Sequence, residues 1–273
     1  MILVRTTRID DQVRTLADRL NIASGQIVAM LVDERQAPVP TELPKVSLTD
    51  AACAKLGLHT PNDFAWRCGD YGFYLARQQF PSEAHYWMIE YDVAISGDAA
   101  QFFATCDAHP HVDMLAADVR PATRDWWWRA SVAASDARPY RCFFPVVRLS
   151  ARAVDTLAAK RRDHSRRLLR RLLWPNDESF AATAAMAAGL SIADVNDLGE
   201  RFYEGDTYSY TNVIDGSRFM PEGAAPRLHH PVLFGDDLAR KLQRLKDDHS
   251  APTPLPKRVY RKIIATANGA MRW

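Results

Sequence analysis

The first 35 residues alternate between two apolar runs and one amphipathic stretch. Residues 1–6 (MILVRT) and 26–32 (QIVAMLV) are apolar runs with the length of a buried strand. Between them, the apolar residues of 10–20 recur with helical spacing, and Asp10 or Asp11 can cap the start of that helix. A strand, a helix and a strand in this order predict a βαβ unit with parallel strands.

The rest of the chain continues this pattern. Further strands are predicted at 45–48, 85–93, 112–117 and 143–149, and helices at 49–56, 70–79, 150–173, 178–188 and 232–246. Three prolines in 36–44 indicate a loop, and 250–256 (SAPTPLP) indicates a linker before a basic helix at 257–267. The chain is therefore expected to form a single α/β domain over 1–249, followed by a linker and a basic C-terminal helix over 250–273.

Composition narrows the class of protein. The 273 residues are 47% apolar and 25% charged, which suffices for a sizeable core, and the net charge of +2 argues against a nucleic-acid partner. No apolar run approaches the ~18 residues of a membrane span, and Arg5 and Arg8 interrupt the apolar run that a signal peptide needs. The four cysteines form no C-x-x-C pair, which favours reduced thiols in a cytoplasm. Few lysines and abundant alanine indicate a GC-rich bacterial gene.

Two carboxylates end the apolar run that begins at residue 85. Glu90 and Asp92 are two positions apart, so in a strand their side chains point to the same side. Two oxygen ligands in this arrangement suit Mg²⁺ or Mn²⁺ bound to a diphosphate. The alternative is a pair of ordinary solvated acids at a strand end.

A second acidic pair and a pair of histidines offer further chemistry. In the turn WPNDESF, Asp177 is a candidate helix cap, and either Asp177 or Glu178 is a candidate general base for an acceptor hydroxyl. His229 and His230 precede Pro231 and can bind a metal or a phosphate. Hydrogen-bonded histidines of purely structural importance are the other interpretation.

Basic and aromatic clusters complete the set of candidate groups. The stretch 160–173 (KRRDHSRRLLRRLL) carries a net charge of +6, and the tail 257–264 repeats its mixture of basic and apolar residues. A solvated surface helix is the simpler interpretation, and contact with anionic lipid or a diphosphate-linked acceptor is the other. Trp126, Trp127 and Trp128 cannot all face one core, so at least one is expected to line a pocket where it could stack on a sugar ring.

The order of these motifs resembles a known class of enzymes. An N-terminal βαβ unit, then WMIEYDVAISGDAAQFF, PNDESFAAT and HHPV look like the GT-A class of nucleotide-sugar glycosyltransferases, over residues 1–246. The acid-acid-aromatic-Thr element is similar to one in the branching N-acetylglucosaminyltransferases. The resemblance implies a GT-A-like, Rossmann-type mixed sheet flanked by helices in a single domain.

Residue roles follow from the resemblance. Glu90 and Asp92 match the D-x-D position, which approaches the donor diphosphate through Mn²⁺ or Mg²⁺, and His230 matches a histidine near that diphosphate. Asp177 or Glu178 matches the acid pair that supplies the base. The other donor-binding positions that the resemblance implies are Arg5, Thr6, Asp33 and Asp70, with Trp126, Trp127 and Trp128 as an acceptor platform.

The motif departs from the family at one point. It is E-Y-D rather than D-x-D, so a metal-independent mechanism remains open, with Arg227 or the basic helix neutralising the diphosphate. The expected activity is transfer of a hexosyl or N-acetylhexosaminyl group from a UDP- or GDP-sugar to a glycan or glycolipid hydroxyl. An inverting reaction in surface polysaccharide biosynthesis, in the cytoplasm or at the inner face of the membrane, is the expected setting.

Other classes fit less well. The chain lacks the P-loop motif, G-x-G-x-x-G and the G-x-S-x-G elbow, and residues 5–9 lack the glycines of a sugar nucleotidyltransferase. The remaining alternative is a catalytically inactive, membrane-peripheral scaffold or a carbohydrate-binding module on the same fold.

Overall fold

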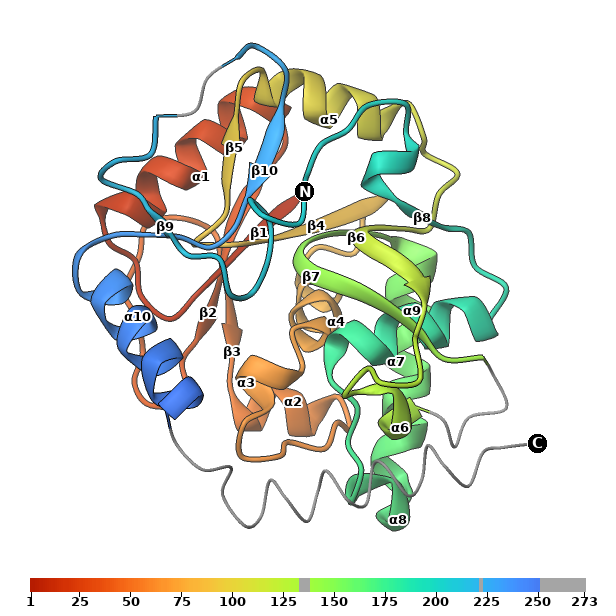
Figure 1. Ribbon diagram of the computed structural model, residues 1–273. Coiled ribbons are helices and arrows are strands. Elements are labelled where there is room, and N and C mark those ends of the chain that lie inside the picture. The colour runs from red at the N-terminus through yellow and green to blue at the C-terminus, as the bar shows by residue number, and fades with distance from the viewer. Residues whose placement is uncertain (133–137, 221–222, 251–273) are drawn as a thin grey trace.

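A computed structural model of the chain describes residues 1–132, 138–220 and 223–250. At its centre is a seven-stranded sheet in the order β3-β2-β1-β4-β7-β6-β8 (Figure 1). Its strands are β1 Ile2–Thr6, β2 Val28–Asp33, β3 Lys45–Leu48, β4 His85–Glu90, β6 Met114–Pro121, β7 Tyr140–Ser150 and β8 Ile192–Asp194. All neighbours pair in parallel except β7, which runs antiparallel to both β4 and β6. The predicted α/β class with a mixed sheet is confirmed, and the arrangement is consistent with a GT-A-like fold.

Helices cover both faces of the sheet. One face carries α1 (Asp11–Ser24) and α5 (Ala99–Asp107), and the other carries α4 (Asp70–Gln79), α7 (Ala151–Arg166) and α9 (Asp177–Ala187). Successive residues of β1 alternate between the two layers, because strand side chains point to opposite faces: Ile2 and Val4 pack toward α1, and Leu3 packs toward α4. All three are fully buried.

The βαβ unit forms as predicted. Asp10 caps α1 by accepting a hydrogen bond from the Val13 amide, and Gly25 ends the helix at φ 65°, a left-handed conformation that glycine adopts without strain. Strands β1 and β2 then pair in parallel. The carboxyl ends of these strands form the edge where α/β sheets bind ligands.

Shorter elements surround this framework. They are α2 Asp50–Lys55, α3 Phe64–Arg67, α6 Arg129–Val132, α8 Leu168–Arg171, α10 Gly235–Ser250, the 3₁₀ turn η1 Val195–Asp197 and the small strands β5 Ala94–Ser96, β9 Ile214–Asp215, β10 Arg227–His229 and β11 Val232–Leu233. Strand β5 pairs with β10, and β9 pairs with β11. In Figure 1, α10 lies to one side of the sheet, apart from the helices that cover its faces.

Two predicted helices are wrong in their extent. The helix predicted over 150–173 ends at Arg166, since Arg167 is extended and the Arg171 side chain hydrogen bonds to the Ser165 carbonyl near that end. The helix predicted from Val232 begins only at Gly235, because Val232 is buried in β11 and its amide donates to the Asp92 carbonyl.

Three further expectations concern the terminus, the cysteines and the membrane. The predicted linker at 250–256 and basic helix at 257–267 lie outside the described residues, apart from Ser250 at the end of α10. All four cysteines are buried free thiols. Among the described residues, no helix combines the length and the apolar character needed to cross a bilayer.

Candidate active site

A cleft of about 610 Å³ opens at the carboxyl ends of β1 and β4. Its walls are Arg5, Trp66, Arg67, Glu90, Tyr91, Asp92, Trp127, Trp128, Phe143, Phe144, Pro145, Asn176, Asp177, Glu178, Tyr210, His230, Leu233, Asp237, Arg240, Lys241 and Arg244. A smaller hollow of about 230 Å³ adjoins it at the ends of β1, β2 and β3 and shares Arg5, Trp66, Glu90 and Tyr91 with it. The cleft therefore lies at the edge where α/β sheets bind ligands.

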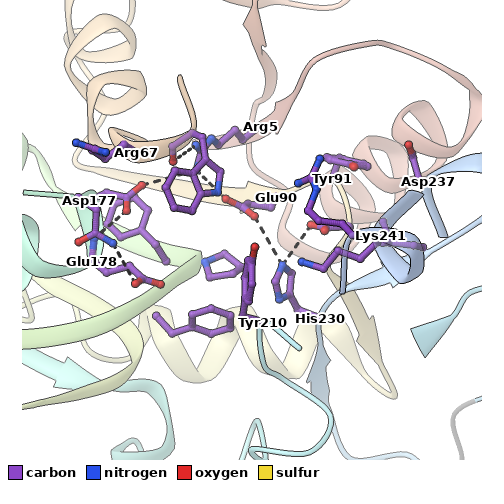
Figure 2. Close-up of a pocket in the computed structure, with 18 of the residues that line it drawn as sticks. Arg5, Arg67, Glu90, Tyr91, Asp177, Glu178, Tyr210, His230, Asp237 and Lys241 are labelled. Atoms are coloured by element: carbon purple, nitrogen blue, oxygen red, sulfur yellow. Dashed lines mark hydrogen bonds and ion pairs between the residues drawn. The ribbon is translucent and has the colours of Figure 1, made fainter. Parts of the chain in front are cut away.

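One group in the cleft consists of Glu90, Asp92 and His230. The His230 Nε2 atom lies 3.7 Å from Glu90 Oε2 and 3.5 Å from Asp92 Oδ1 (Figure 2). The backbone explains the meeting of segments far apart in sequence, because the Val232 amide donates to the Asp92 carbonyl at 2.7 Å. The structure thus brings the two predicted acids and the predicted histidine together.

The chemistry of these three side chains fits a divalent cation. His230 Nδ1 lies 2.9 Å from the Ser209 carbonyl, so this nitrogen carries the proton and Nε2 faces the acids. The gaps of 3.5 and 3.7 Å are too long for good hydrogen bonds, and Asp92 Oδ1 is buried with no hydrogen-bond partner. One ligand atom from each residue lies within 4.8 Å of the other two, so the predicted Mn²⁺ or Mg²⁺ can be held here.

The same group shows how charge is distributed without a cation. Burial raises the pKa of Asp92 to about 6, and the neighbouring charge of Glu90 adds to this rise. Burial acts in the same sense on Glu90, but the positive charges of Arg5 and His230 outweigh it and lower the pKa of Glu90. Burial lowers the pKa of His230, yet the two acids reverse this and leave it raised. In the absence of a metal ion, a proton on His230 therefore supplies the positive charge that offsets the two carboxylates.

Arg5 connects this group to the second acidic pair. It lies opposite Glu90 in the β1–β4 register, and its Nη1 atom donates to Glu90 Oε1 at 2.7 Å. The same nitrogen is 3.8 Å from Asp177 Oδ2, and Nη2 donates to the Trp66 carbonyl at 3.0 Å. One guanidinium therefore fixes the distance between the two acidic groups.

The second pair lies at the start of α9, and the two acids differ. The helix cap is Asn176, which accepts from the Ser179 amide, so the predicted cap at Asp177 is wrong. Both oxygens of Asp177 accept backbone hydrogen bonds at 2.8 Å, from Gly69 and from Glu178. Glu178 accepts one hydrogen bond, from the Asn176 side chain to Oε2, and its carboxylate points into the cleft (Figure 2).

Both carboxyls of this pair have pKa values close to neutral pH. Burial raises the pKa of Asp177 to about 7, and the charges of Asp70 and Glu90 add to it against the opposing charge of Arg5. Burial raises the pKa of Glu178 to about 8, and the charge of Asp177 adds to it. A carboxylate with such a pKa is a stronger base than an ordinary one, which suits general-base chemistry.

Of the four predicted nucleoside contacts, Arg5, Thr6 and Asp33 line the smaller hollow and Asp70 does not. Thr6 and Asp33 are there, although the Thr6 hydroxyl donates to the Arg8 carbonyl and Asp33 pairs with Arg35. The expectation for Asp70 is wrong. Its carboxylate is fully buried and accepts two hydrogen bonds from Arg161, at 2.7 and 3.0 Å, so no oxygen of it faces a ligand.

Two of the three consecutive tryptophans line the cleft, and the third does not. Trp127 and Trp128 line the cleft, as expected for at least one of the three. Trp126 lies outside it, with the Arg141 guanidinium 5.1 Å from its ring centre. The structure therefore offers two of the three rings to an acceptor.

Apart from Arg5, the cations of the cleft are not those that the sequence analysis proposed for the diphosphate. Arg227 belongs to β10 and does not line the cleft, and the 160–173 run contributes nothing to its walls. Helix α10 supplies Arg240, Lys241 and Arg244 instead, and α3 supplies Arg67. The spacing i, i+1, i+4 on a predicted helix is the signal that could have identified the first three as one basic face.

Comparisons with known proteins add little to this geometry. No family model matches the chain, and no curated protein matches its sequence. Among solved structures, the apo form of mouse xyloside xylosyltransferase 1 is similar, with 11% identity and a TM-score of 0.41, over 71% of this chain and 83% of that chain. A likeness at this level says nothing of what the cleft binds.

Proposed function

We propose that this chain is a glycosyltransferase that moves a sugar from a nucleoside-diphosphate sugar to an acceptor hydroxyl. The observation that carries the proposal is the pairing of two different acidic groups across one guanidinium. Glu90, Asp92 and His230 form a cation site, and Asp177 and Glu178 form a basic carboxylate pair. Group transfer from a diphosphate needs both, because the leaving group must be neutralised while the acceptor loses a proton.

The walls suggest how the donor lies. The smaller hollow, with Thr6 and Asp33, takes the nucleoside of a UDP- or GDP-sugar. The diphosphate then reaches the shared boundary at Arg5 and Glu90, within reach of the α10 cations Lys241 and Arg244. A divalent cation held by Glu90, Asp92 and His230, when bound, supplies further charge neutralisation. This placement leaves the sugar between α9 and the three residues Glu90, Asp92 and His230, hereafter the cation group.

The transfer itself is a single displacement. Glu178 takes the proton of the acceptor hydroxyl, the acceptor oxygen bonds to the anomeric carbon, and the bond from that carbon to the diphosphate oxygen breaks. The electron pair of that bond leaves with the nucleoside diphosphate, whose charge Arg5, Lys241 and Arg244 stabilise. Glu178 rather than Asp177 has this role because both Asp177 oxygens already accept backbone amides. One displacement inverts the anomeric configuration.

The finer aspects of the proposal follow the sequence resemblance. The transferred group is a hexosyl or N-acetylhexosaminyl unit, and the acceptor is a glycan or glycolipid that stacks on Trp127 and Trp128. The setting is surface polysaccharide synthesis in a bacterium, in the cytoplasm or at the membrane's inner face.

A thermal-shift and turnover experiment tests the proposal. Binding of one nucleoside diphosphate raises the Tm by mass action, and Mn²⁺ enlarges the shift if the cation group takes part. Slow hydrolysis of the matching nucleotide sugar, lost in Glu178→Gln, completes the expected result, and NMR of the product gives its anomeric configuration. Absence of any shift with UDP, GDP or their sugars contradicts the proposal. Glycan binding without nucleotide binding would instead favour a carbohydrate-binding module. Binding of neither a glycan nor a nucleotide would favour a scaffold.

A further inference from the structure

A second large cavity lies on the other side of α9 from the sheet edge just described. It has a volume of about 500 Å³ and is bounded by residues of α6, α7 and α9 and by the segment around α8. Its floor is formed by Val132, Leu173, Phe180, Ala184 and the His164 ring. None of its residues lines the candidate active site.

The hydroxyl groups inside this cavity already have hydrogen-bond partners within the protein. The Ser131 hydroxyl donates to the Trp128 carbonyl at 2.6 Å, and the Thr183 hydroxyl donates to the Tyr140 carbonyl at 3.2 Å. Burial lowers the pKa of His164 to about 4, so its ring is neutral at physiological pH. The inner walls are therefore apolar carbon, two hydrogen-bonded hydroxyls and an uncharged ring, an environment that favours a hydrocarbon.

The rim of the cavity is cationic. Lys160 and Arg170 lie there, and within the described part of the chain neither forms an ion pair. The one acid of the rim, Asp163, is paired with Arg167 at 3.1 Å. An anionic group placed at the rim therefore finds two uncompensated positive charges, next to an apolar interior.

The surface beside the rim is also unusual. Leu168 and Leu172 are 73% and 76% exposed. They alternate in sequence with the basic residues Arg166, Arg167, Arg170 and Arg171. Large apolar side chains among arginines are typical of segments that enter the headgroup region of an anionic bilayer.

We propose that this cavity takes one hydrocarbon chain of a membrane lipid that carries a phosphate, with Lys160 and Arg170 at the phosphate and Leu168 and Leu172 in the bilayer surface. The charge of the rim fits this occupant. The chain's own tail at 257–264 and a second copy of the basic surface carry the same sign of charge and are disfavoured. This proposal is independent of the proposed glycosyl transfer. Lipid binding and nucleotide binding are measured in separate experiments, so either one can fail without the other.

A chain-length series tests the occupant of the cavity. Calorimetry with octyl, decyl and dodecyl phosphate, each below its micelle concentration, should show affinity rising about four-fold per methylene. Inorganic phosphate and dodecyl maltoside, which each lack one half of the amphiphile, should bind far more weakly. An affinity that is independent of chain length, or equal for inorganic phosphate, overturns the proposal.

Variants keep the test specific to this cavity. Ala187→Trp places an indole at an exposed wall position of α9, where the fold tolerates it, and should flatten the dependence on chain length. Ala104→Trp, at an exposed position of α5 on the other face, is its matched control. Lys160→Gln with Arg170→Gln should weaken all alkyl phosphates by a similar factor. Unchanged binding in Ala187→Trp would place the ligand elsewhere.

Vesicles then test the membrane source. Sedimentation with phosphatidylcholine vesicles containing phosphatidylglycerol should pull down the protein, and pure phosphatidylcholine vesicles should not. Leu168→Ser with Leu172→Ser should reduce the bound fraction, whereas Ile22→Ser, at an 82% exposed position of α1, should leave it unchanged. Equal binding to neutral vesicles, or none to anionic ones, contradicts a phosphate-bearing lipid as the occupant.

Discussion

Arg5 couples two groups that a transfer reaction needs at a fixed separation. Its Nη1 atom contacts Glu90 and lies 3.8 Å from Asp177, and its Nη2 atom donates to the backbone carbonyls of Ala65 and Trp66. A planar guanidinium with several donors in fixed directions suits this position better than a lysine ammonium. The relative position of the cation group and α9 therefore depends on one side chain rather than on the loops that carry them.

At the residue scale, Glu178→Gln tests the proposed general base. Loss of a general base should lower kcat by roughly 10²–10⁴-fold while donor affinity is retained. In the wild type, kcat should rise with pH through about 8, because only the ionised Glu178 accepts a proton. Glu204→Gln, an exposed acid far along the chain, is the control. A flat pH profile between 6 and 9, or an active Glu178→Gln, would remove Glu178 from the mechanism.

The same variant should stabilise the fold in a pH-dependent way. The pKa of Glu178 is raised in the folded chain, so the stability linked to this group is full below its ordinary pKa and is lost as the pH rises through about 8. Glutamine does not ionise, so Glu178→Gln should raise the Tm at pH 8 and leave it unchanged near pH 4. Melting curves at the two pH values measure the difference, and equal shifts would contradict a raised pKa.

Gly69 is a second residue with a specific requirement. Its φ is an ordinary −55°, but a Cβ atom there would lie 2.7 Å from both Arg5 Nη1 and Asp177 Oδ2. Gly69→Ala should therefore displace Arg5 or Asp177, lower the free energy of unfolding by about 1–3 kcal/mol and reduce activity. Gly205→Ala, where a Cβ meets nothing within 4 Å, should be neutral in both measurements. Full activity in Gly69→Ala would mean that this contact is unimportant.

At the scale of elements, α10 is a basic wall that the sheet does not hold. Its contacts include the ion pair of Arg8 with Asp237 and the ammonium of Lys241, which lies 3.7 Å from the Tyr210 ring centre. Its basic face can therefore serve the ligand without being needed for the core. The helix that completes the cleft is then one whose own packing contributes little to stability.

Removal of this basic face should weaken donor binding alone. Lys241→Gln with Arg244→Gln should lower the affinity for a nucleoside diphosphate by roughly 10²–10⁴-fold, because each of the two lost hydrogen bonds to a charged group contributes about 1.5–3 kcal/mol. The Tm without ligand should barely change. Lys246→Gln lies on the same helix outside the cleft and should bind as the wild type does. Titrations at low and high salt check the electrostatic origin, which weakens as salt rises.

The sequence predicts some elements of the site and not others for identifiable reasons. Glu90 and Asp92 follow a recognisable apolar strand, and strand ends of a parallel sheet meet at one edge, so their place in the cleft is predictable. The role of α10 is not, because the spacing of Arg240, Lys241 and Arg244 indicates a basic face but does not show that the helix lies beside the cleft. The resemblance places Asp70 at the donor, and only the buried ion pair with Arg161, 91 residues away in sequence, shows that its role is structural.

At the scale of the whole molecule, the Asp70–Arg161 pair ties α4 to the helices on the same face. Both side chains are fully buried, and Arg161 also donates to the Pro175 carbonyl, directly before the acidic turn. Removal of one partner of a buried ion pair leaves the other charge uncompensated, which is far more costly than loss of a surface pair. The position of the turn that carries Asp177 and Glu178 therefore depends on a buried ion pair between two helices.

Arg161→Met should accordingly destabilise the whole fold. The expected loss is about 3–5 kcal/mol, which corresponds to a Tm lower by roughly 6–20 °C in a domain of this size. Arg152→Met is the control. Arg152 is 68% exposed, and its partner Asp113 keeps hydrogen bonds from Ser150 and Ser191, so the loss there should be under about 1 kcal/mol. Similar Tm losses in the two variants would contradict the importance of burial.

The one reversed strand of the sheet has a consequence for how the protein can diversify. Because β7 runs against β6, the connection between them returns at the ligand edge, and it carries Trp127 and Trp128 into the cleft. The residues of the cation group come from β4 and from the β10–β11 segment on the opposite wall. The wall that carries Trp127 and Trp128 can therefore change in length or sequence with no change in strand register. The wall that carries Glu90, Asp92 and His230 then stays constant. For the proposed glycosyl transfer, exchange of the segment that carries Trp127 and Trp128 is expected to change the acceptor preference and to leave donor binding unaltered.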